Sequence, residues 1–338
     1  MADLAKDHLI TTVSEDREAT CWGCGLRLLL PSSAPIFKCG WCGAITNQNP
    51  RDCERKCSWW RPWRDRCFVC ILIVYMLFVI CGGVWALYPV VFSVNSFSGI
   101  FHSIITMILC VTTLSSFSLA AFQCAGKPPN IQWGIYPVVR KGDLEDYTFC
   151  RYCSKPKSPR THHCRTCRMC IWDMDHHCPF IGNCVGAANH RYFLLFLISA
   201  VISTIYVSIM SAYAGWHIWP PLTYRFSRLS GFNRDMAFRV AMEVFVALLR
   251  SAVLLSARGL VLVYLFVTSI SVQVGLGLLL WQQLCYIYEG KTYLSHLSSR
   301  GNDVGPKDCQ NIFRFFGCPY PISRYMPNFL RSRKRHNW

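Results

Sequence analysis

The stretch CRYCSKPKSPRTHHCRTCRMCIWDMDHHCPFIGNC, residues 150–184, holds seven cysteines and four histidines within 35 residues. Two Cys-x2-Cys pairs begin at Cys150 and at Cys164, and each pair supplies half of a four-ligand zinc site. Two complete sites use eight of these eleven side chains, so three of them are left over. A purely structural zinc module does not need that surplus.

The motif DHHC, residues 175–178, lies within this stretch and places two histidines side by side. Adjacent side chains of an extended segment point in opposite directions, so His176 and His177 cannot easily bind the same metal. We expect one of them to face a zinc ion and the other to lie near Asp175 and Cys178. A carboxylate that orients an imidazole, which in turn accepts the thiol proton, activates a cysteine nucleophile. The motif therefore predicts metal binding and a reactive thiol together.

Four uncharged runs elsewhere in the chain are long enough to cross a bilayer, which takes about 20 apolar residues. They span residues 67–92, 97–124, 192–219 and 259–288, in a chain that is 52% hydrophobic. A single run of this kind could be a buried core helix of a large soluble protein, but four of them favour a membrane protein. The predicted fold class is an all-α polytopic membrane protein. It has four transmembrane helices, a cytosolic cysteine-rich two-zinc domain between helices 2 and 3, and a small N-terminal zinc ribbon.

Flanking charges predict the orientation of these helices. The polar N-terminus has no apolar signal segment, so we expect the first helix to direct insertion. The basic stretch RPWRDR, residues 61–66, precedes that helix, whereas the link 93–96 carries no charge. The positive-inside rule then places the N-terminus, residues 125–191 and the C-terminal tail in the cytosol. Cytosolic thiols stay reduced, so clustered cysteines there indicate metal binding or catalysis rather than disulfides.

The region between helices 3 and 4 is harder to assign. Residues 240–257 are apolar apart from Glu243 and Arg250, which share one face of a helix. A fifth span would bury both charges and move the basic tail to the lumen, so we expect an interfacial or re-entrant helix.

The expected parts of the chain are a cytosolic N-terminal region 1–60 with a ribbon at 21–42, helices 1 and 2 within 67–124, the cysteine-rich domain 125–191, helix 3 at 192–219, a luminal loop 220–258, helix 4 at 259–288 and a cytosolic basic tail 289–338.

A second cysteine cluster lies near the N-terminus, in the pattern C-x2-C-x14-C-x2-C. Its four thiolates, from Cys21, Cys24, Cys39 and Cys42, suit a closed tetrahedral zinc site. The intervening stretch LRLLLPSSAPIF, residues 26–37, is expected to form its small apolar core. The role of this ribbon stays open between stiffening the N-terminal region and binding a partner.

Residues 150–193 resemble the DHHC family of protein S-acyltransferases, or palmitoyltransferases. The resemblance includes every cysteine spacing, Asn189 and Phe193 after the last cysteine, and the plan of two helices on either side of the cysteine-rich domain. The N-terminal ribbon and the stretch EGKTYLSHLSS, residues 289–299, are most similar to plant members. The resemblance implies an enzyme that transfers a long-chain acyl group, such as palmitoyl from palmitoyl-CoA, first to its own cysteine and then to a cysteine of a target protein.

The resemblance also implies a role for each site residue. Cys178 would be the nucleophile, His176 its base and Asp175 the residue that orients the base. One zinc would be held by Cys150, Cys153, His163 and Cys170, and the other by Cys164, Cys167, His177 and Cys184.

Four further residues are implied to contact the acyl-CoA. Lys157, Arg160 and His162 would bind the coenzyme A phosphates, although a patch that touches lipid phosphates is the alternative for this basic loop. Ser203 corresponds to the residue that closes the far end of the acyl-chain cavity. Because serine is small, we expect a deep cavity that accepts palmitate and stearate; alternatively, Ser203 only packs helix against helix.

Three family motifs are altered in this chain. KPPN, residues 127–130, stands in place of DPG, TYLS from Thr292 in place of TTxE, and Phe180 in place of a tryptophan. The stretch NIFRFFG, residues 311–317, resembles the tail element whose asparagine packs the cytosolic domain against the membrane helices.

Two other functional classes are weaker. A non-catalytic zinc adaptor would keep the eight ligands without needing Asp175, His176 and Cys178 together, and a transporter would place ionisable residues inside its helices. Nucleic acid is the alternative partner for a chain of net charge +17, but these charges flank membrane helices. The expected partners are therefore acyl-CoA, the lipid bilayer and proteins with accessible cysteines, and the resemblance suggests endomembranes such as the Golgi apparatus.

Overall fold

The computed structural model describes residues 17–30, 36–47, 60–92, 96–128, 141–153, 155–220, 234–298 and 308–317. The chain divides into two compact units. One comprises Met1–Trp63, Cys124–Cys178 and Cys184–Ala188, and is called the cysteine-rich unit here. The other comprises Arg64–Gln123, Pro179–Asn183 and Asn189–Trp338, and is called the helical unit. The polar N-terminal stretch 1–16 and the basic end of the tail, 318–338, lie outside the described residues.

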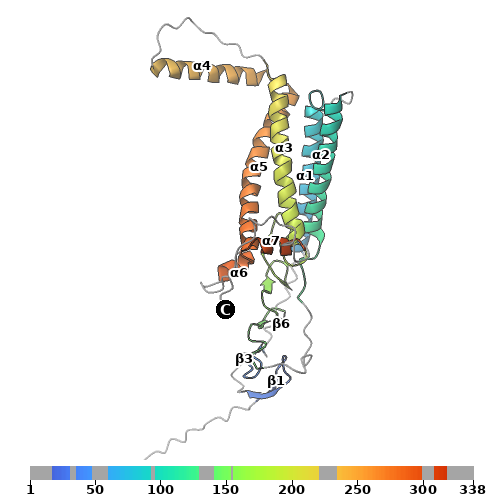
Figure 1. The fold of residues 1–338 in the computed structure, drawn as a ribbon, viewed down its shortest axis with the longest axis vertical. Helices are drawn as coiled ribbons and strands as arrows, with labels where there is room; N and C mark the ends of the chain where they lie inside the picture. The colour runs from blue at the N-terminus through green and yellow to red at the C-terminus, as the bar shows by residue number, and fades with distance from the viewer. Residues whose placement is uncertain are drawn as a thin grey trace, which may run out of the picture. The chain divides into compact units, whose positions relative to one another are not determined.

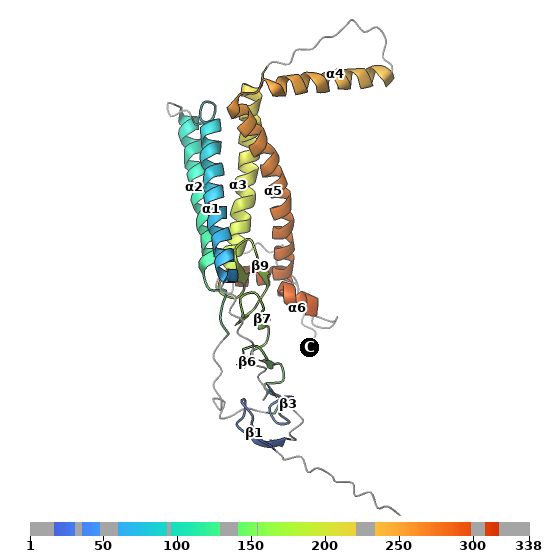
Figure 2. The same cartoon turned by 180° about the vertical axis from the view of Figure 1, so that it is seen from behind.

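Four long helices form the helical unit, and each is long and apolar enough to cross a membrane. They are α1 (Trp60–Leu87), α2 (Phe97–Phe122), α3 (His190–Ile218) and α5 (Ala257–Tyr288), which lie side by side in Figures 1 and 2. The four predicted spans are therefore confirmed. Only the ends differ, because charged residues ahead of an apolar run can extend its helix, as at the start of α1.

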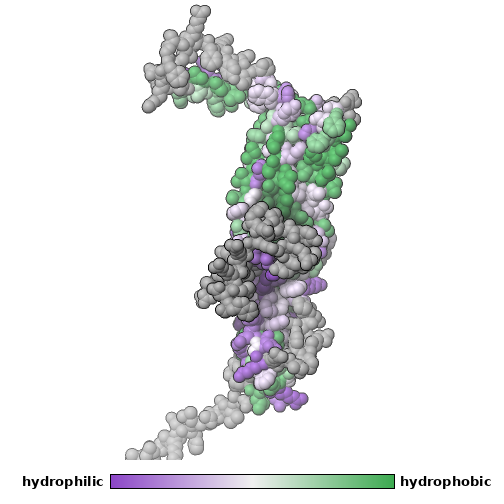
Figure 3. Space-filling model, viewed as in Figure 1, coloured by the Kyte–Doolittle hydropathy of each residue, from purple (hydrophilic) through white to green (hydrophobic). Residues whose placement is uncertain are grey.

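Small polar side chains hold α2 against α3. The hydroxyls of Thr113 and Ser203 lie 3.1 Å apart, and those of Ser116 and Ser199 lie 3.3 Å apart about one turn away. Such small residues let membrane helices approach closely. Large apolar side chains cover the outside of the helices, which Figure 3 shows as a hydrophobic surface over the bundle.

A further helix, α4 (Arg234–Val253), lies in the region expected to be interfacial or re-entrant. It is not one of the four candidate spans, and in Figures 1 and 2 it projects sideways from the end of the bundle, beside the place where α3 ends and α5 begins. Its exposed charged residues Arg239, Glu243 and Arg250 follow one stripe. A separate stripe of exposed apolar residues consists of Phe238, Met242, Phe245 and Leu249. This amphipathic pattern is typical of a helix at a membrane surface.

The cysteine-rich unit consists of short antiparallel hairpins. They pair β1 (Arg17–Thr20) with β2 (Arg27–Leu30), β3 (Ile36–Lys38) with β4 (Ile45–Asn47), β5 (Thr148–Cys150) with β6 (Lys155–Lys157), β7 (His162–Cys164) with β8 (Met169–Ile171), and β9 (His176–Cys178) with β10 (Asn183–Val185). The tight turn at each cysteine pair of the ribbon ends in left-handed backbone, which Gly25 and Gly43, the residues after the second cysteines, adopt with φ of 74° and 81°. Their amides donate to the carbonyls of Cys21 and Cys39, four residues earlier.

The apolar core of the N-terminal ribbon differs from the prediction. Leu29 is 69% exposed, and Leu26 and Ile36 are also exposed, so most of the described part of residues 26–37 is not core. From the predicted stretch, Leu28 packs against the core and Phe37 is buried. The rest of the core consists of Trp22, Ala44, the cysteines and Leu144, which comes from far along the sequence. Hairpins this short cannot bury a face by themselves. The segment that leads into the central cysteines therefore completes the ribbon, and backbone bonds from Leu144 N to Cys42 O (2.9 Å) and Gly142 N to Trp41 O (3.0 Å) hold it there.

Two short helices, α6 (Tyr293–Ser298) and α7 (Cys309–Phe315), follow α5. Thr292 and Ser295 cap the start of α6 reciprocally, since each side chain accepts a bond from the other's backbone amide. Serine thus takes the place that glutamate has in a capping box. Asn311 of α7 donates through Nδ2 to the carbonyl of Tyr288 at the end of α5, at 2.9 Å. This tail element therefore contacts the end of a membrane helix through its asparagine, while a role in packing the cytosolic domain against the helices stays a prediction.

Candidate functional site

Three groups of cysteine and histidine side chains each bring four ligand atoms within 4.8 Å of one another. The ribbon cluster contains Cys21, Cys24, Cys39 and Cys42, the first central cluster Cys150, Cys153, His163 and Cys170, and the second central cluster Cys164, Cys167, His177 and Cys184. These are the same twelve residues, in the same groups, that the sequence and the resemblance pointed to.

The spacing of the sulfurs fits tetrahedral zinc. A Zn–S bond of about 2.3 Å puts two sulfurs of one tetrahedron about 3.8 Å apart. The observed separations are 3.5 Å for Cys21 and Cys42, 3.7 Å for Cys24 and Cys39, 3.7 Å for Cys153 and Cys170, and 3.4 Å for Cys167 and Cys184. A disulfide would need about 2.05 Å. Each cluster could therefore hold one zinc ion through reduced thiols.

The central clusters are interleaved because strand residues alternate in direction. In β7, His163 belongs to the first central cluster and the next residue, Cys164, belongs to the second. Both histidine ligands present Nδ1. His163 Nδ1 lies 3.2 Å from Cys153 Sγ, and His177 Nδ1 lies 3.4 Å from Cys167 Sγ. Since β7 carries a ligand of each central cluster, loss of one cluster would loosen the other.

The same alternation separates the two adjacent histidines of β9. His177 faces the second central cluster, with Nδ1 3.5 Å from Cys184 Sγ. His176 instead has its Nδ1 2.8 Å from Oδ2 of Asp175, so the imidazole N–H donates to that carboxylate. Asp175 is fully buried, and its backbone amide donates to Val185 O of the paired strand. The structure thus gives the two histidines different partners, as the sequence predicted.

Cys178 completes this group of polar side chains. It lies two residues after His176 in β9, on the same face of the strand, and its thiol bonds the His176 imidazole. Burial alone would lower the pKa of His176, but the hydrogen bonds from Asp175 and Cys178 outweigh it and raise the pKa to about 9. An imidazole of this basicity can accept the thiol proton. The chemistry that the arrangement supports is activation of a buried thiol.

The segment that follows Cys178 belongs to the helical unit and packs closely there. Gly182 has φ of 57°, and a Cβ at this position would lie 2.8 Å from the carbonyl oxygen of Asp65 in α1. Asn183 Nδ2 donates to the carbonyls of Ala121 (3.1 Å) and Gln123 (2.7 Å). These carbonyls end α2 and have no partner within the helix. The backbone immediately after the thiol is therefore fixed on two membrane helices.

Two more polar residues beside these helices were not singled out as functional by the sequence. His190, the first residue of α3, lies with Nε2 3.0 Å from Oε1 of Gln283 in α5, and both side chains are buried. Phe315 of α7 packs edge-on against the same imidazole, with ring centroids 4.9 Å apart. The signal available in the sequence was that Gln283 is one of three glutamines within an uncharged run, and its partner lies far away in the sequence.

The three residues suggested for coenzyme A have different surroundings. Arg160 is about half exposed, and its Nε lies 2.8 Å from Oδ1 of Asp173. His162 is half-buried in β7, where burial and then the charge of Lys157 lower the pKa of its imidazole. Lys157 is half-buried in β6. A phosphate contact for these residues stays a prediction, and at Arg160 the phosphate would compete with Asp173.

Ser203 lies at the contact of α2 with α3, where its hydroxyl bonds Thr113. This contact agrees with the alternative role considered for Ser203, in which it only packs α3 against α2. A role for Ser203 in measuring the acyl chain stays a prediction.

Residues 144–300 match the family model described as DHHC palmitoyltransferase. Among the curated relatives, "Palmitoyltransferase pfa3" of Emericella nidulans is 33% identical over 161 residues, which are 41% of this chain and 31% of that protein. "Probable protein S-acyltransferase 16" of Arabidopsis thaliana is 31% identical over 146 residues, covering 41% of this chain and 50% of that protein. "Palmitoyltransferase ZDHHC15" of Homo sapiens is 45% identical over 72 residues, 21% of each chain. The chain thus spans half or less of the length of these relatives. The part of the chain that matches this family model, residues 144–300, contains both central clusters and Cys178.

Proposed function

We propose that the chain is a protein S-acyltransferase that moves a long-chain acyl group from acyl-CoA to cysteines of other proteins. The observation that carries this proposal is the continuous Asp175–His176–Cys178 contact beside, but not within, a metal cluster. The match of residues 144–300 to palmitoyltransferases supports the same conclusion.

The first step loads the acyl group on the chain itself. Cys178 Sγ attacks the thioester carbonyl carbon of the acyl-CoA while His176 accepts the thiol proton. The bond from that carbon to the coenzyme A sulfur breaks, and the leaving thiolate takes the proton back from His176. The products are S-acyl Cys178 and free coenzyme A. Asp175 holds the imidazole in place and stabilises its charged form.

The second step passes the acyl group to a target protein. A thiol of the target attacks the thioester carbonyl of S-acyl Cys178 and gives its proton to His176. Cys178 leaves as a thiolate and regains the proton, so the chain returns to its starting state. One thioester is exchanged for another in both steps, and the reaction needs no oxidant or energy source besides acyl-CoA.

The metal clusters would support this chemistry without taking part in it. Zinc at these clusters would contribute folding free energy. His177 and Cys184 lie on either side of Cys178 in the sequence, and both belong to the second central cluster. Their attachment fixes β9 and β10 and therefore the position of the thiol.

The setting of the activity is part of the proposal. The four membrane helices support an integral membrane protein. The positive-inside pattern favours a site that faces the cytosol, where acyl-CoA and the thiols of target proteins are available. An endomembrane such as the Golgi is the expected location, and the acylated Cys178 makes the chain itself a lipoprotein during turnover.

The test is acylation of the purified full-length chain with an alkyne-bearing palmitoyl-CoA, read as a hydroxylamine-labile label. Cys178→Ser is expected to abolish self-labelling and transfer while zinc content stays unchanged. Cys309→Ser is the matched control, because Cys309 is an exposed thiol in α7 outside the three clusters, and it is expected to label normally. A label that persists in Cys178→Ser would contradict the proposed nucleophile, whereas absence of label in the unmodified chain would favour a non-catalytic zinc adaptor.

Acyl-chain length gives a second test. An apolar chain gains about 0.8 kcal/mol for each buried CH2, so the depth of the cavity should set the preferred length. Ser203→Tyr is expected to shift the preference from palmitoyl-CoA to shorter acyl-CoAs, measured with a series of graded lengths. If a well-folded variant kept the same preference for acyl-chain length, Ser203 would not line the acyl-chain cavity, and its role would be limited to packing α3 against α2 through Thr113.

A further inference from the structure

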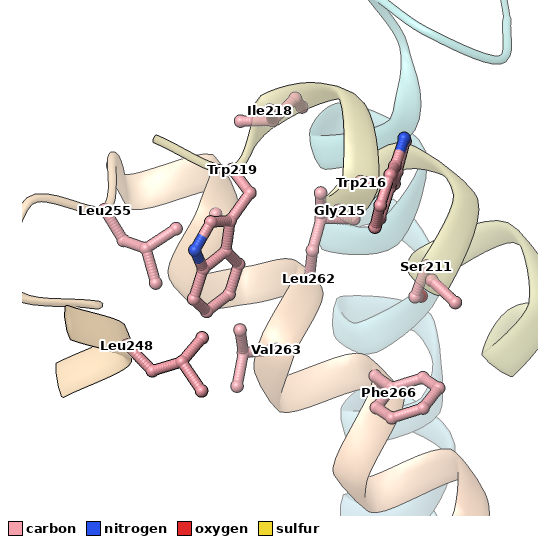
Figure 4. Close-up of a pocket in the computed structure, with 12 residues that line it drawn as sticks. Ser211, Gly215, Trp216, Ile218, Trp219, Leu248, Leu255, Leu262, Val263 and Phe266 are labelled. Atoms are coloured by element: carbon pink, nitrogen blue, oxygen red, sulfur yellow. The ribbon is translucent and has the colours of Figure 1, made fainter. Parts of the chain in front are cut away.

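A cavity of about 760 Å³ lies at the end of the helical unit where α3 ends and α5 begins. Figure 4 shows its lining, which comes from the last turns of α3, from Leu248 of α4 and from the first turns of α5. This volume is within the range of about 300–1,000 Å³ that is usual for small-molecule sites. Neither Cys178 nor Ser203 lines it, so the cavity is separate from the site described above.

Two buried polar atoms in this lining have no hydrogen-bond partner. Across the residues that the structure describes, three buried side-chain polar atoms lack a partner, and two of them, Ser211 Oγ and Trp219 Nε1, belong to the cavity lining. Ser211 is 2% exposed. Other serines of the membrane helices, such as Ser208 and Ser269, donate to a carbonyl three residues earlier. A buried polar group without a partner is costly, so these two atoms call for a ligand.

The lining restricts the chemistry of that ligand. An indole N–H can only donate, so Trp219 requires an acceptor oxygen. None of the described residues that line the cavity is charged, and a phosphate or ammonium head group would lie there without a counter-charge. Tryptophans at the ends of membrane helices lie at the level of lipid head groups. We propose that this cavity binds a neutral membrane lipid with a hydroxyl head group, which accepts a hydrogen bond from Trp219.

The surroundings of Trp219 give the site a defined shape. Figure 4 shows its indole among Leu248, Leu255 and Val263, so the ring lies between α4 and the start of α5. Ser251 Oγ donates to Pro220 O at 3.1 Å, which fixes the end of α4 to the end of α3. The helix α4 therefore closes one side of the cavity.

Gly215 offers a way to fill the cavity without disturbing the fold. It lines the cavity, and a Cβ added to it would meet no atom within 4 Å. A leucine there would therefore extend into space that the ligand needs. Gly277 in α5 is the matched control, because its Cβ would also meet no atom within 4 Å, but it does not line the cavity.

The experiment uses the full-length chain in phosphatidylcholine vesicles with a photoactivatable sterol that carries a free hydroxyl. Mass spectrometry is expected to locate the crosslink in peptides from residues 211–219 or 255–266. Gly215→Leu should remove that crosslink and Gly277→Leu should keep it. Trp219→Phe keeps the aromatic ring but loses the donor, and should weaken labelling roughly two- to tenfold. Equal labelling of all variants would mean that the probe reacts with the helices from the surrounding bilayer and not from the cavity, which would overturn the proposal.

Two further probes separate the sources of such a ligand. Competition by monoacylglycerol but not by sterol would identify the hydroxyl lipid as a glyceride, and the reverse would identify it as a sterol. Labelling of the same peptides by a photoactivatable palmitoyl-CoA, without competition from either lipid, would overturn the proposal, because the cavity would then belong to the acyl chain. All of these readouts are crosslinks, so they are independent of the proposed transferase activity.

Discussion

The ribbon cluster and the second central cluster use the same kind of metal-binding turn but have different neighbours. Around the ribbon cluster lie Trp22, Ala44 and Leu144, which form an apolar core. Beside the second central cluster lies β9, whose opposite face carries His176 and Cys178 against the buried Asp175. Metal-ligand spacing is thus shared by a closed site and by a site next to a thiol. What distinguishes them is the presence of titratable side chains that the metal does not need.

Removing a ligand of the second central cluster is expected to have the largest effect. Structural zinc contributes roughly 10–16 kcal/mol to folding, which is comparable to the whole stability of a typical domain of about 5–15 kcal/mol. Cys164→Ala should therefore lower the zinc content by at least one ion and unfold residues 141–188. Elemental analysis and hydrogen exchange measure both. Cys178→Ser is the control and should change neither, and a loss of zinc there would contradict the assignment of ligands.

The next largest effect concerns the carboxylate. Asp175→Asn should slow acyl loading by roughly 10²–10⁴-fold because the His176 imidazole loses its oriented, charge-stabilised state. Asp173→Asn is the matched control two residues earlier, since Asp173 pairs with Arg160 near the surface. A surface pair contributes about 0–1 kcal/mol, so loading should change less than about tenfold. Equal rates for the two variants would remove Asp175 from the mechanism. Zinc content should stay constant in both.

The smallest effect on activity is expected in the ribbon. Leu144→Ala removes a buried side chain from the ribbon core and should destabilise it by about 2–5 kcal/mol, measured as faster zinc release to a chelator from residues 17–47. Leu29→Ala, at an exposed position of the same ribbon, should be within about 0.5 kcal/mol of the unmodified chain. Acyl loading of Cys178 should persist in both variants. If loading falls in step with zinc release, the ribbon takes part in the reaction and the contrast between the two clusters fails.

The sequence was most informative where a pattern is local. Uncharged runs located the four membrane helices to within a few residues, apart from the early start of α1, because length and apolarity suffice to define a span. Alternation along an extended segment was enough to give His176 and His177 different partners, since it depends only on adjacent residues. The spacing of the cysteines was enough to group the four ribbon ligands, and the resemblance supplied the grouping of the eight central ligands.

Contacts between distant segments could not be predicted in this way. The ribbon core was assigned to residues 26–37, and Leu28 does pack against it, but the distant Leu144 is also part of it because three- and four-residue strands cannot bury a face alone. The His190–Gln283 pair and the bonds from Asn183 to the end of α2 likewise join residues that no periodic pattern relates. The cavity near Trp219 depends on three helices meeting, and its unpartnered polar atoms become apparent only from the packing.

The most direct test of the account is to find where the acyl group is attached during turnover. The full-length chain would be mixed with palmitoyl-CoA, quenched in acid before transfer to a target, digested and analysed by mass spectrometry. The account predicts a hydroxylamine-labile palmitoyl group on the peptide that contains Cys178, and none on the ribbon cysteines or the eight central ligands. A palmitoyl group on any of those cysteines, with Cys178 unmodified, would contradict it.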